Sequence, residues 1–174
     1  ILMMVAQQEK QIVVMKRIKD GKVTSKQQEN REVGFRHYMS EHFPEIEIIE
    51  LGLTMKTTKK DYDLRLENFF NEHSQIQHCI TFGSKAHIMG DFLLRTTRRS
   101  TQIMGYDMVG KNAECLRQGS VSFLVAQHAY QQGYCCIDTL FKAIVLKKKV
   151  EPVNYMPIEL LTKENMDFYR RTQL

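Results

Sequence analysis

The sequence lacks any apolar run close to the roughly 20 residues that a membrane-spanning helix requires. Its apolar opening, ILMMVA, is short and has neither the basic flank nor the small-residue cleavage site of a secretory signal. The sequence also contains no internal repeat, no low-complexity tract and no long glycine- or serine-rich linker. These absences argue against a membrane protein and favour one globular domain.

Motifs for catalysis and metal binding are missing as well. No Gly-x-Gly-x-x-Gly or Walker loop follows a predicted strand, and no nucleophile–base pair stands out. The six histidines show no His-Glu-x-x-His spacing, and the spacing of Cys79, Cys115, Cys135 and Cys136 matches no zinc motif. We therefore expect no enzyme activity, no catalytic residue, no metal and no cofactor. The cysteines are interpreted as reduced thiols, which favours a cytoplasmic location.

The composition that remains is typical of a globular protein. The 174 residues are 43% hydrophobic and 26% charged, enough for one sizeable core. The net charge of +5 is more simply explained by scattered surface Lys and Arg than by nucleic-acid binding. The apolar run starts at Ile1 without a capping residue, which predicts entry into the middle of a helix and a chain that continues upstream.

Hydrophobic periodicity alternates between strands and helices along the whole chain. Strands are predicted at 11–18, 45–53, 77–82, 101–106 and 120–126, with an extended tail at 153–161. Helices are predicted at 25–42, 59–73, after Ser84, and at 112–118, 130–147 and 162–165. This order predicts an α/β fold in which a parallel sheet carries helices on both faces, giving three layers.

Polar residues follow the predicted strands. In open α/β sheets, ligands bind at the carboxyl ends of the strands, in the loops that lead into helices. That rule selects Arg31, Ser84, Asp107 and Gln127. A guanidinium fork, a carboxylate, a hydroxyl and an amide together suit a polyhydroxylated ligand.

Several segments also carry a family resemblance. The segment NREVGF at 30–35 resembles the Arg-x-x-Gly-aromatic helix start of LacI-type effector domains and periplasmic sugar-binding proteins. The segments SKAHIMG at 84–90 and GYD at 105–107 are similar to the family's Asn-Asp-x-x-Ala-x-Gly and Gly-Tyr/Phe-Asp segments. VAQ at 125–127, the following Gly133 and PIELLT at 157–162 resemble its strand-to-hinge glutamine and its closing strand. The resemblance extends from Ile1 to about Tyr169.

The resemblance implies a periplasmic-binding-protein-like type I fold, mainly its C-terminal lobe. The chain would be a single effector-binding fragment, with 1–126 and 151–174 in that lobe and the helix in 127–150 crossing toward an absent N-terminal lobe. It also implies a transcription regulator that acts as a homodimer and binds operator DNA through a headpiece outside this chain. The alternative is an extracytoplasmic solute-binding protein or the sugar-binding domain of a sensor kinase.

The implied effector is a carbohydrate held by Arg31, Asp107 and Gln127, with Ser84 and Tyr62 as further candidates. Each has a structural alternative: a surface ion pair for Arg31, a helix N-cap for Asp107 and Ser84, an ordinary loop position for Gln127 and a core position for Tyr62. Ser84 and Lys85 replace the Asn and Asp of the family, a departure from its usual sugar-binding pattern. The alternatives are an acidic sugar, a phosphorylated ligand or a site that has lost the family's binding pattern. Ile137, Phe141 and Ile144 form an apolar stripe expected in a core, and exposed if the second lobe is absent.

Overall fold

A computed structural model describes residues 10–23, 25–55, 58–96 and 100–171. Its strands are β1 (Gln11–Ile18), β2 (Glu47–Thr54), β3 (His78–Ile80), β4 (Gln102–Tyr106), β5 (Phe123–Ala126) and β6 (Glu159–Leu161). Its helices are α1 (Lys26–His42), α2 (Lys59–Glu72), α3 (Ala86–Arg95), α4 (Gly110–Gln118), α5 (Ala129–Ile144) and α6 (Met166–Arg171). The predicted alternation of strands and helices is thereby confirmed.

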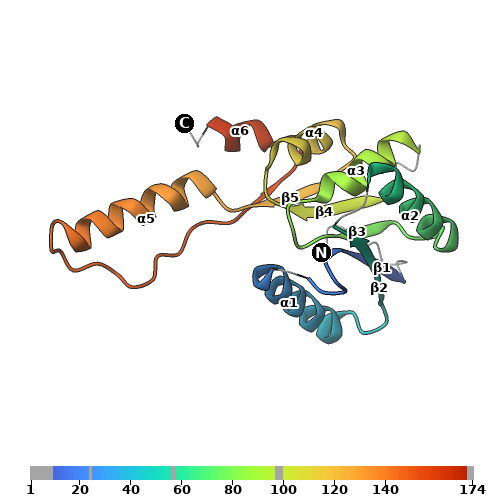
Figure 1. The fold of residues 1–174 in the computed structure, drawn as a ribbon, viewed down its shortest axis with the longest axis horizontal. Coiled ribbons are helices and arrows are strands. Elements are labelled where there is room, and N and C mark those ends of the chain that lie inside the picture. The colour runs from blue at the N-terminus through green and yellow to red at the C-terminus, as the bar shows by residue number, and fades with distance from the viewer. Residues whose placement is uncertain (1–9, 24, 56–57, 97–99, 172–174) are drawn as a thin grey trace.

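The six strands form one sheet in the order β2-β1-β3-β4-β5-β6. The first five are parallel, in agreement with the prediction, but β6 pairs with β5 in the antiparallel direction. Helix α1 covers one face, and α2, α3 and α4 lie along the other (Figure 1). The molecule therefore has the predicted three layers, with its parallel strands ending at one common edge.

Each face of the sheet packs its own apolar core. Val14 of β1 lies in a cluster with Phe35 and Met39 of α1, all nearly inaccessible to solvent. The next residue along β1, Met15, points to the opposite face and joins the larger cluster beneath α2, α3 and α4. This alternation follows from the two-residue period of a strand. A run of buried β-branched residues is typical of strands that are covered on both faces.

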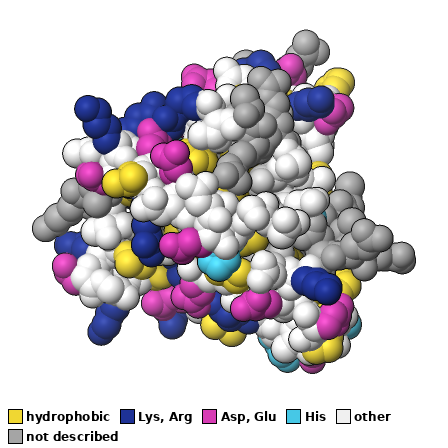
Figure 2. All heavy atoms as spheres, turned by 90° about the vertical axis from the view of Figure 1, so that its right-hand side faces the viewer, with side chains coloured by type: hydrophobic (Ala, Val, Ile, Leu, Met, Phe, Trp, Pro, Cys, Tyr) yellow, Lys and Arg dark blue, Asp and Glu magenta, His cyan; other side chains and the backbone are white. Residues whose placement is uncertain are grey.

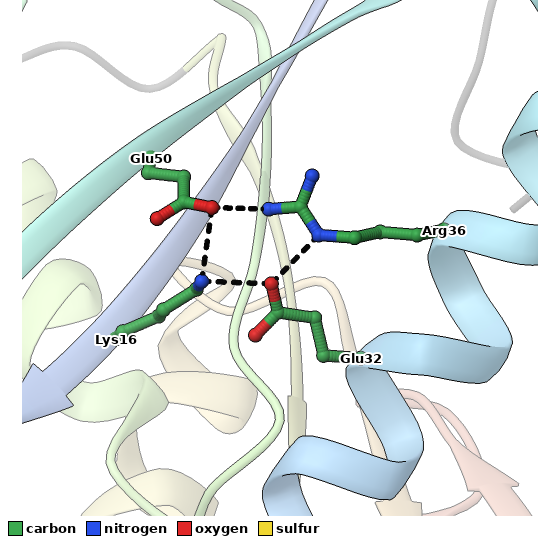
Figure 3. A network of polar contacts seen from close by, with 4 residues as sticks. All are labelled: Lys16, Glu32, Arg36 and Glu50. Carbon is green, nitrogen blue, oxygen red and sulfur yellow. Dashed lines mark hydrogen bonds and ion pairs between the residues drawn. The ribbon is translucent and has the colours of Figure 1, made fainter. Parts of the chain in front are cut away.

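Four charged side chains fasten α1 to the sheet (Figure 3). Lys16 of β1 lies 2.7 Å from Glu32 of α1 and 3.0 Å from Glu50 of β2. Arg36, one turn along α1, closes the ring with contacts of 2.7 Å to Glu32 and 2.5 Å to Glu50. Because Glu32 adjoins Arg31, the ring also fixes the position of a predicted ligand residue.

We expect Glu32→Gln to lower the free energy of unfolding by about 2 kcal/mol, because it leaves Lys16 without its closest partner. Burial acts to raise the pKa of Glu32, but the hydrogen bonds and charges of Lys16 and Arg36 hold it below 4.5. The stabilisation is therefore complete above pH 4.5 and is lost as the pH falls through the lower pKa of the folded protein. Urea unfolding between pH 3 and pH 7 measures both effects. The exposed control Glu67→Gln should change neither, and an equal loss in both variants would contradict the role of the ring.

Several element boundaries differ from the predicted ones. Strand β3 covers three residues rather than 77–82, and β5 begins at Phe123 rather than Ser120. Residues 162–165 form a turn instead of the predicted final helix, which begins only at Met166. Asp20 and Gly21 form the turn after β1, which two backbone hydrogen bonds between Lys19 and Lys22 close. The helix predicted at the start of the chain lies outside the described residues.

Helix α5 and the segment 145–158 that returns to β6 project from the body of the molecule, and we call them the arm (Figure 1). No residue of α5 is buried, and Ile137, Phe141 and Ile144 are 68%, 50% and 61% exposed. On the face drawn in Figure 2, on the opposite side from the arm, basic and acidic side chains are interspersed and apolar ones are scattered. None of the described helices combines the length and apolar character needed to cross a bilayer.

Candidate functional site

Arg31 reaches from α1 to the carboxyl ends of two central strands. One of its terminal nitrogens donates to the Phe82 carbonyl at 2.8 Å, just beyond β3. Its guanidinium carbon lies 4.0 Å from the centre of the Tyr106 ring at the end of β4. The surface ion pair considered as an alternative is not present among the described residues. The two contacts instead hold a partly buried guanidinium in one orientation, with donors left over.

Asp107 and Gln127 meet at the ends of β4 and β5. The Gln127 amide donates to the Asp107 carboxylate at 2.7 Å, and Gln27 at the start of α1 donates to the Gln127 side-chain oxygen at 3.4 Å. Asp107 has a φ of 66°, a conformation that Asp and Asn tolerate better than most residues. Since Asp107 follows Tyr106 directly, Arg31, Tyr106, Asp107 and Gln127 form one continuous group, which we call the strand-end site.

Asn112 holds the loops beneath the strand-end site. This fully buried side chain donates to the carbonyls of Ser84, Tyr106 and Asp107 at 3.0–3.2 Å. Its oxygen accepts from the His87 N–H at 3.0 Å, at the start of α3. One amide thus links the loops after β3 and β4. Tyr106 stands in the GYD segment that the sequence pattern selects, but no sequence signal pointed to Asn112 or Gln27.

Neither Ser84 nor Asp107 is a helix N-cap, the structural alternative considered for each. The N-cap residue of α3 is Lys85 rather than Ser84, and the Lys85 side chain makes no capping hydrogen bond to the helix. Asn112 bonds the first turn of α3 from a distant part of the chain, so a Ser84 cap is not needed. Helix α4 begins at Gly110 with Val109 as its N-cap, which leaves Asp107 outside the helix and free to pair with Gln127.

Tyr62 belongs to a different part of the surface. Its hydroxyl donates to the Thr54 carbonyl at 2.9 Å, and its ring packs against the core beneath α2. No contact joins it to Arg31, Asp107 or Gln127 among the described residues. The structure therefore brings three of the five predicted residues together, links Ser84 to them through its backbone, and separates Tyr62 from them.

The strand-end site offers donors and acceptors on a partly apolar surface. Burial raises the pKa of Tyr106 above 10, so its ring is neutral at pH 7 beneath the Arg31 cation. The guanidinium supplies hydrogen-bond donors, the Asp107 carboxylate accepts, and the Gln127 amide does both. This combination fits vicinal hydroxyl groups. Among the described residues, no group of three His, Cys, Asp or Glu side chains is placed to hold a metal ion.

A family model and several solved structures show what the chain is similar to. A family model described as a periplasmic binding protein domain matches residues 2–149. The structure also matches that of a Bacteroides fragilis protein described as a "putative LacI transcriptional regulator", with a TM-score of 0.90 and 43% sequence identity. That match covers 97% of this chain and 57% of the other, so this chain spans little more than half of its relative. No curated protein matched the sequence.

Two more distant structures share the fold. One is a carbohydrate transporter solute-binding protein from Agrobacterium radiobacter in complex with D-arabinose, with 20% identity, a TM-score of 0.75 and coverage of 95% of this chain and 55% of that one. The other is an arabinose-binding protein from Geobacillus stearothermophilus, with 14% identity, a TM-score of 0.72 and coverage of 92% and 57%. At these identities the likeness concerns the fold alone.

Proposed function

The chain belongs to the family of periplasmic binding protein domains, and from this premise we propose that it is the effector-binding part of a LacI-type transcription regulator. The effector is a small carbohydrate, and Arg31, Asp107 and Gln127 bind its hydroxyl groups. The single observation that carries this proposal is the continuous group of contacts from Arg31 through Tyr106 and Asp107 to Gln127. A regulator is favoured over a solute-binding protein because the regulator-like structure is 43% identical and the transporter proteins are 20% or less.

The arm supports a second part of the proposal, the division into lobes. Residues 1–126 and 151–174 would form one lobe, and 127–150 would cross to another. When a partner surface covers an exposed apolar stripe, each large side chain that becomes buried stabilises the contact by about 1.5 to 3 kcal/mol. The stripe of Ile137, Phe141 and Ile144 fits such a partner, here the other lobe of the same regulator. Ligand closure between the lobes would change the spacing of DNA-binding headpieces in a cytoplasmic homodimer.

Gln127 is well placed to couple the ligand to the arm. The Gln132 side chain of α5 donates to the Gln127 carbonyl at 2.6 Å, while the Gln127 amide faces Asp107. Next to it, His128 is buried at a φ of 51°, and its ring nitrogen lies 2.6 Å from Glu159 of β6. A ligand that draws Gln127 toward itself would therefore act on the residues from which α5 starts.

The proposed function is tested by calorimetric titration of the full-length regulator, with both lobes, against arabinose, ribose, galactose and glucose. We expect at least one sugar to bind, and Asp107→Asn to weaken that binding about tenfold, because an amide replaces a charged acceptor. Asparagine tolerates the positive φ at this position, so the loop should keep its shape. The matched control Asp20→Asn also lies at a positive φ, in the turn after β1, and should leave affinity unchanged. Failure of every sugar to bind would count against a carbohydrate effector.

A further inference from the structure

A concave site lies between α2, α3 and the start of α4. We call it the basic pocket. Its volume is about 290 Å³, close to the lower end of the range for small-molecule sites. Its lining includes five basic side chains and two acidic ones: Arg17, Lys59, Lys85, Arg95 and Lys111 with Asp63 and Asp91. Arg31, Asp107 and Gln127 do not line it.

The two acidic groups of the basic pocket are already engaged. Asp63 forms a bidentate ion pair with Arg95, with nitrogen–oxygen distances of 2.5 and 2.7 Å. Asp91 accepts a hydrogen bond from the Cys115 thiol at 3.4 Å. Once Arg95 is paired with Asp63, four cations face a single remaining carboxylate. The pocket therefore has an excess of positive charge and attracts anions.

The remaining cations form no ion pair at contact distance among the described residues, although the charge of Lys59 also acts on Asp63. The Nε of Arg17 is buried and makes no hydrogen bond, although a terminal nitrogen of the same group reaches the Met55 carbonyl at 3.5 Å. Lys59 and Lys111 are exposed in the first turns of α2 and α4, and neither forms an ion pair among the described residues. A buried donor without a partner costs free energy that a bound acceptor would recover.

Local structure adds backbone donors to the basic pocket. Helix α4 starts without a side-chain cap, so its first N–H groups are available beside Lys111. Burial lowers the pKa of His87, and the charges of Lys85 and Lys111 lower it further against the opposing effect of Asn112. His87 is thus neutral at pH 7, and its Nδ1 donates to the Asn112 oxygen at 2.9 Å, so its other ring nitrogen is an acceptor and adds no donor to the cavity. The cationic side chains and the backbone donors of α4 together suit the tetrahedral oxygens of a phosphate.

We propose that the basic pocket is a second ligand site, which binds the phosphate group of a small phosphorylated metabolite independently of the strand-end site. The volume accommodates a phosphate and a short carbon chain, and the lysines at the mouth bind it from two helices. A phosphorylated compound there would contact α2, α3 and α4 at once, and α3 and α4 also hold Asn112 and the loops of the strand-end site. The basic pocket and the strand-end site therefore lie at the same edge of the sheet.

The test is titration of the 174-residue chain with inorganic phosphate, glucose 6-phosphate and glucose. We expect glucose 6-phosphate and phosphate to bind and to raise the melting temperature, glucose to be without effect on this site, and added NaCl to weaken the binding. The double variant Lys59→Gln/Lys111→Gln should lower phosphate affinity about tenfold, because each lysine contributes a charge-assisted contact. Both residues are exposed, so the variant should fold normally.

The control is Lys22→Gln/Lys149→Gln, which makes the same change in net charge at exposed positions outside the basic pocket. It should leave phosphate affinity unchanged. Equal losses in the two double variants would reduce the effect to general electrostatics and overturn the site, as would the absence of any phosphate binding. Arg31→Ala should leave phosphate binding intact. If it removes phosphate binding, the anion occupies the strand-end site and the second site does not exist.

Discussion

Arg31→Ala is expected to lower sugar affinity by about 100-fold. Each hydrogen bond from a charged group contributes about 1.5 to 3 kcal/mol, and the variant loses at least one such bond to the ligand. The side chain is held in place before a ligand arrives, by the Phe82 carbonyl on one side and the Tyr106 ring on the other. Binding therefore costs little side-chain entropy at Arg31. The alanine variant loses these donors, which are already oriented for the ligand. Calorimetry with the tightest-binding sugar measures the loss.

Two further variants separate geometry from charge at this position. Arg31→Lys keeps the positive charge but loses the planar fork, so its affinity should fall between those of the unmodified chain and Arg31→Ala. Arg65→Ala removes an exposed arginine from α2 and should have no effect on sugar binding. If Arg31→Ala folds normally by urea unfolding and binds sugar as tightly as the unmodified chain, the strand-end site is assigned wrongly.

Gly105→Ala should be the most damaging single change to stability, lowering the free energy of unfolding by about 3 kcal/mol. A Cβ at position 105 of β4 would lie 2.5 Å from the Cβ of Ala86, at the start of α3. Both atoms are fixed directly to the backbone, so neither side chain can rotate away, and α3 must move off the sheet. Urea unfolding measures the loss, and the shift should also weaken sugar binding because α3 adjoins the strand-end site.

The chain offers a matched control and a rescue for this variant. Gly34→Ala adds a methyl group in open space on α1 and should stabilise the protein by up to about 1 kcal/mol, because alanine favours a helix. Adding Ala86→Gly to the Gly105→Ala variant removes the opposing Cβ and should restore part of the lost stability. A Gly105→Ala variant as stable as the unmodified chain would show that α3 packs less closely than described.

The sequence predicted the elements well because their physical causes are local. Short β-branched runs, such as the one at Ile12, identify strands, and the rule for parallel sheets then places Asp107 and Gln127 at one edge. The direction of β6 was missed because nothing in a three-residue strand encodes its pairing partner. The cap alternatives failed for a related reason, since Asn112 supplies hydrogen bonds to residues 25 to 28 positions away.

Charge pairing shows the same limit. Glu32 and Arg36 stand one helical turn apart, a spacing that favours an ion pair. Their connection to Lys16 and Glu50 depends on how α1 lies on the sheet, which periodicity does not reveal. The basic pocket likewise combines residues from β1, α2, α3 and α4, so its excess of cations appears only once the helices are arranged in space.

The antiparallel pairing of β5 with β6 makes the arm separable in principle. Ala126 and Glu159 are directly opposed in the register, so the chain leaves the sheet and re-enters it at adjacent points. A two-residue Asn-Gly connection is the preferred link between opposed antiparallel strands. Excising the arm together with Gln127 and His128, and joining Ala126 to Glu159 in this way, would convert the long excursion into a tight β-hairpin. The remaining sheet and its helices would become a minimal, compact scaffold that lacks the Gln127 part of the strand-end site.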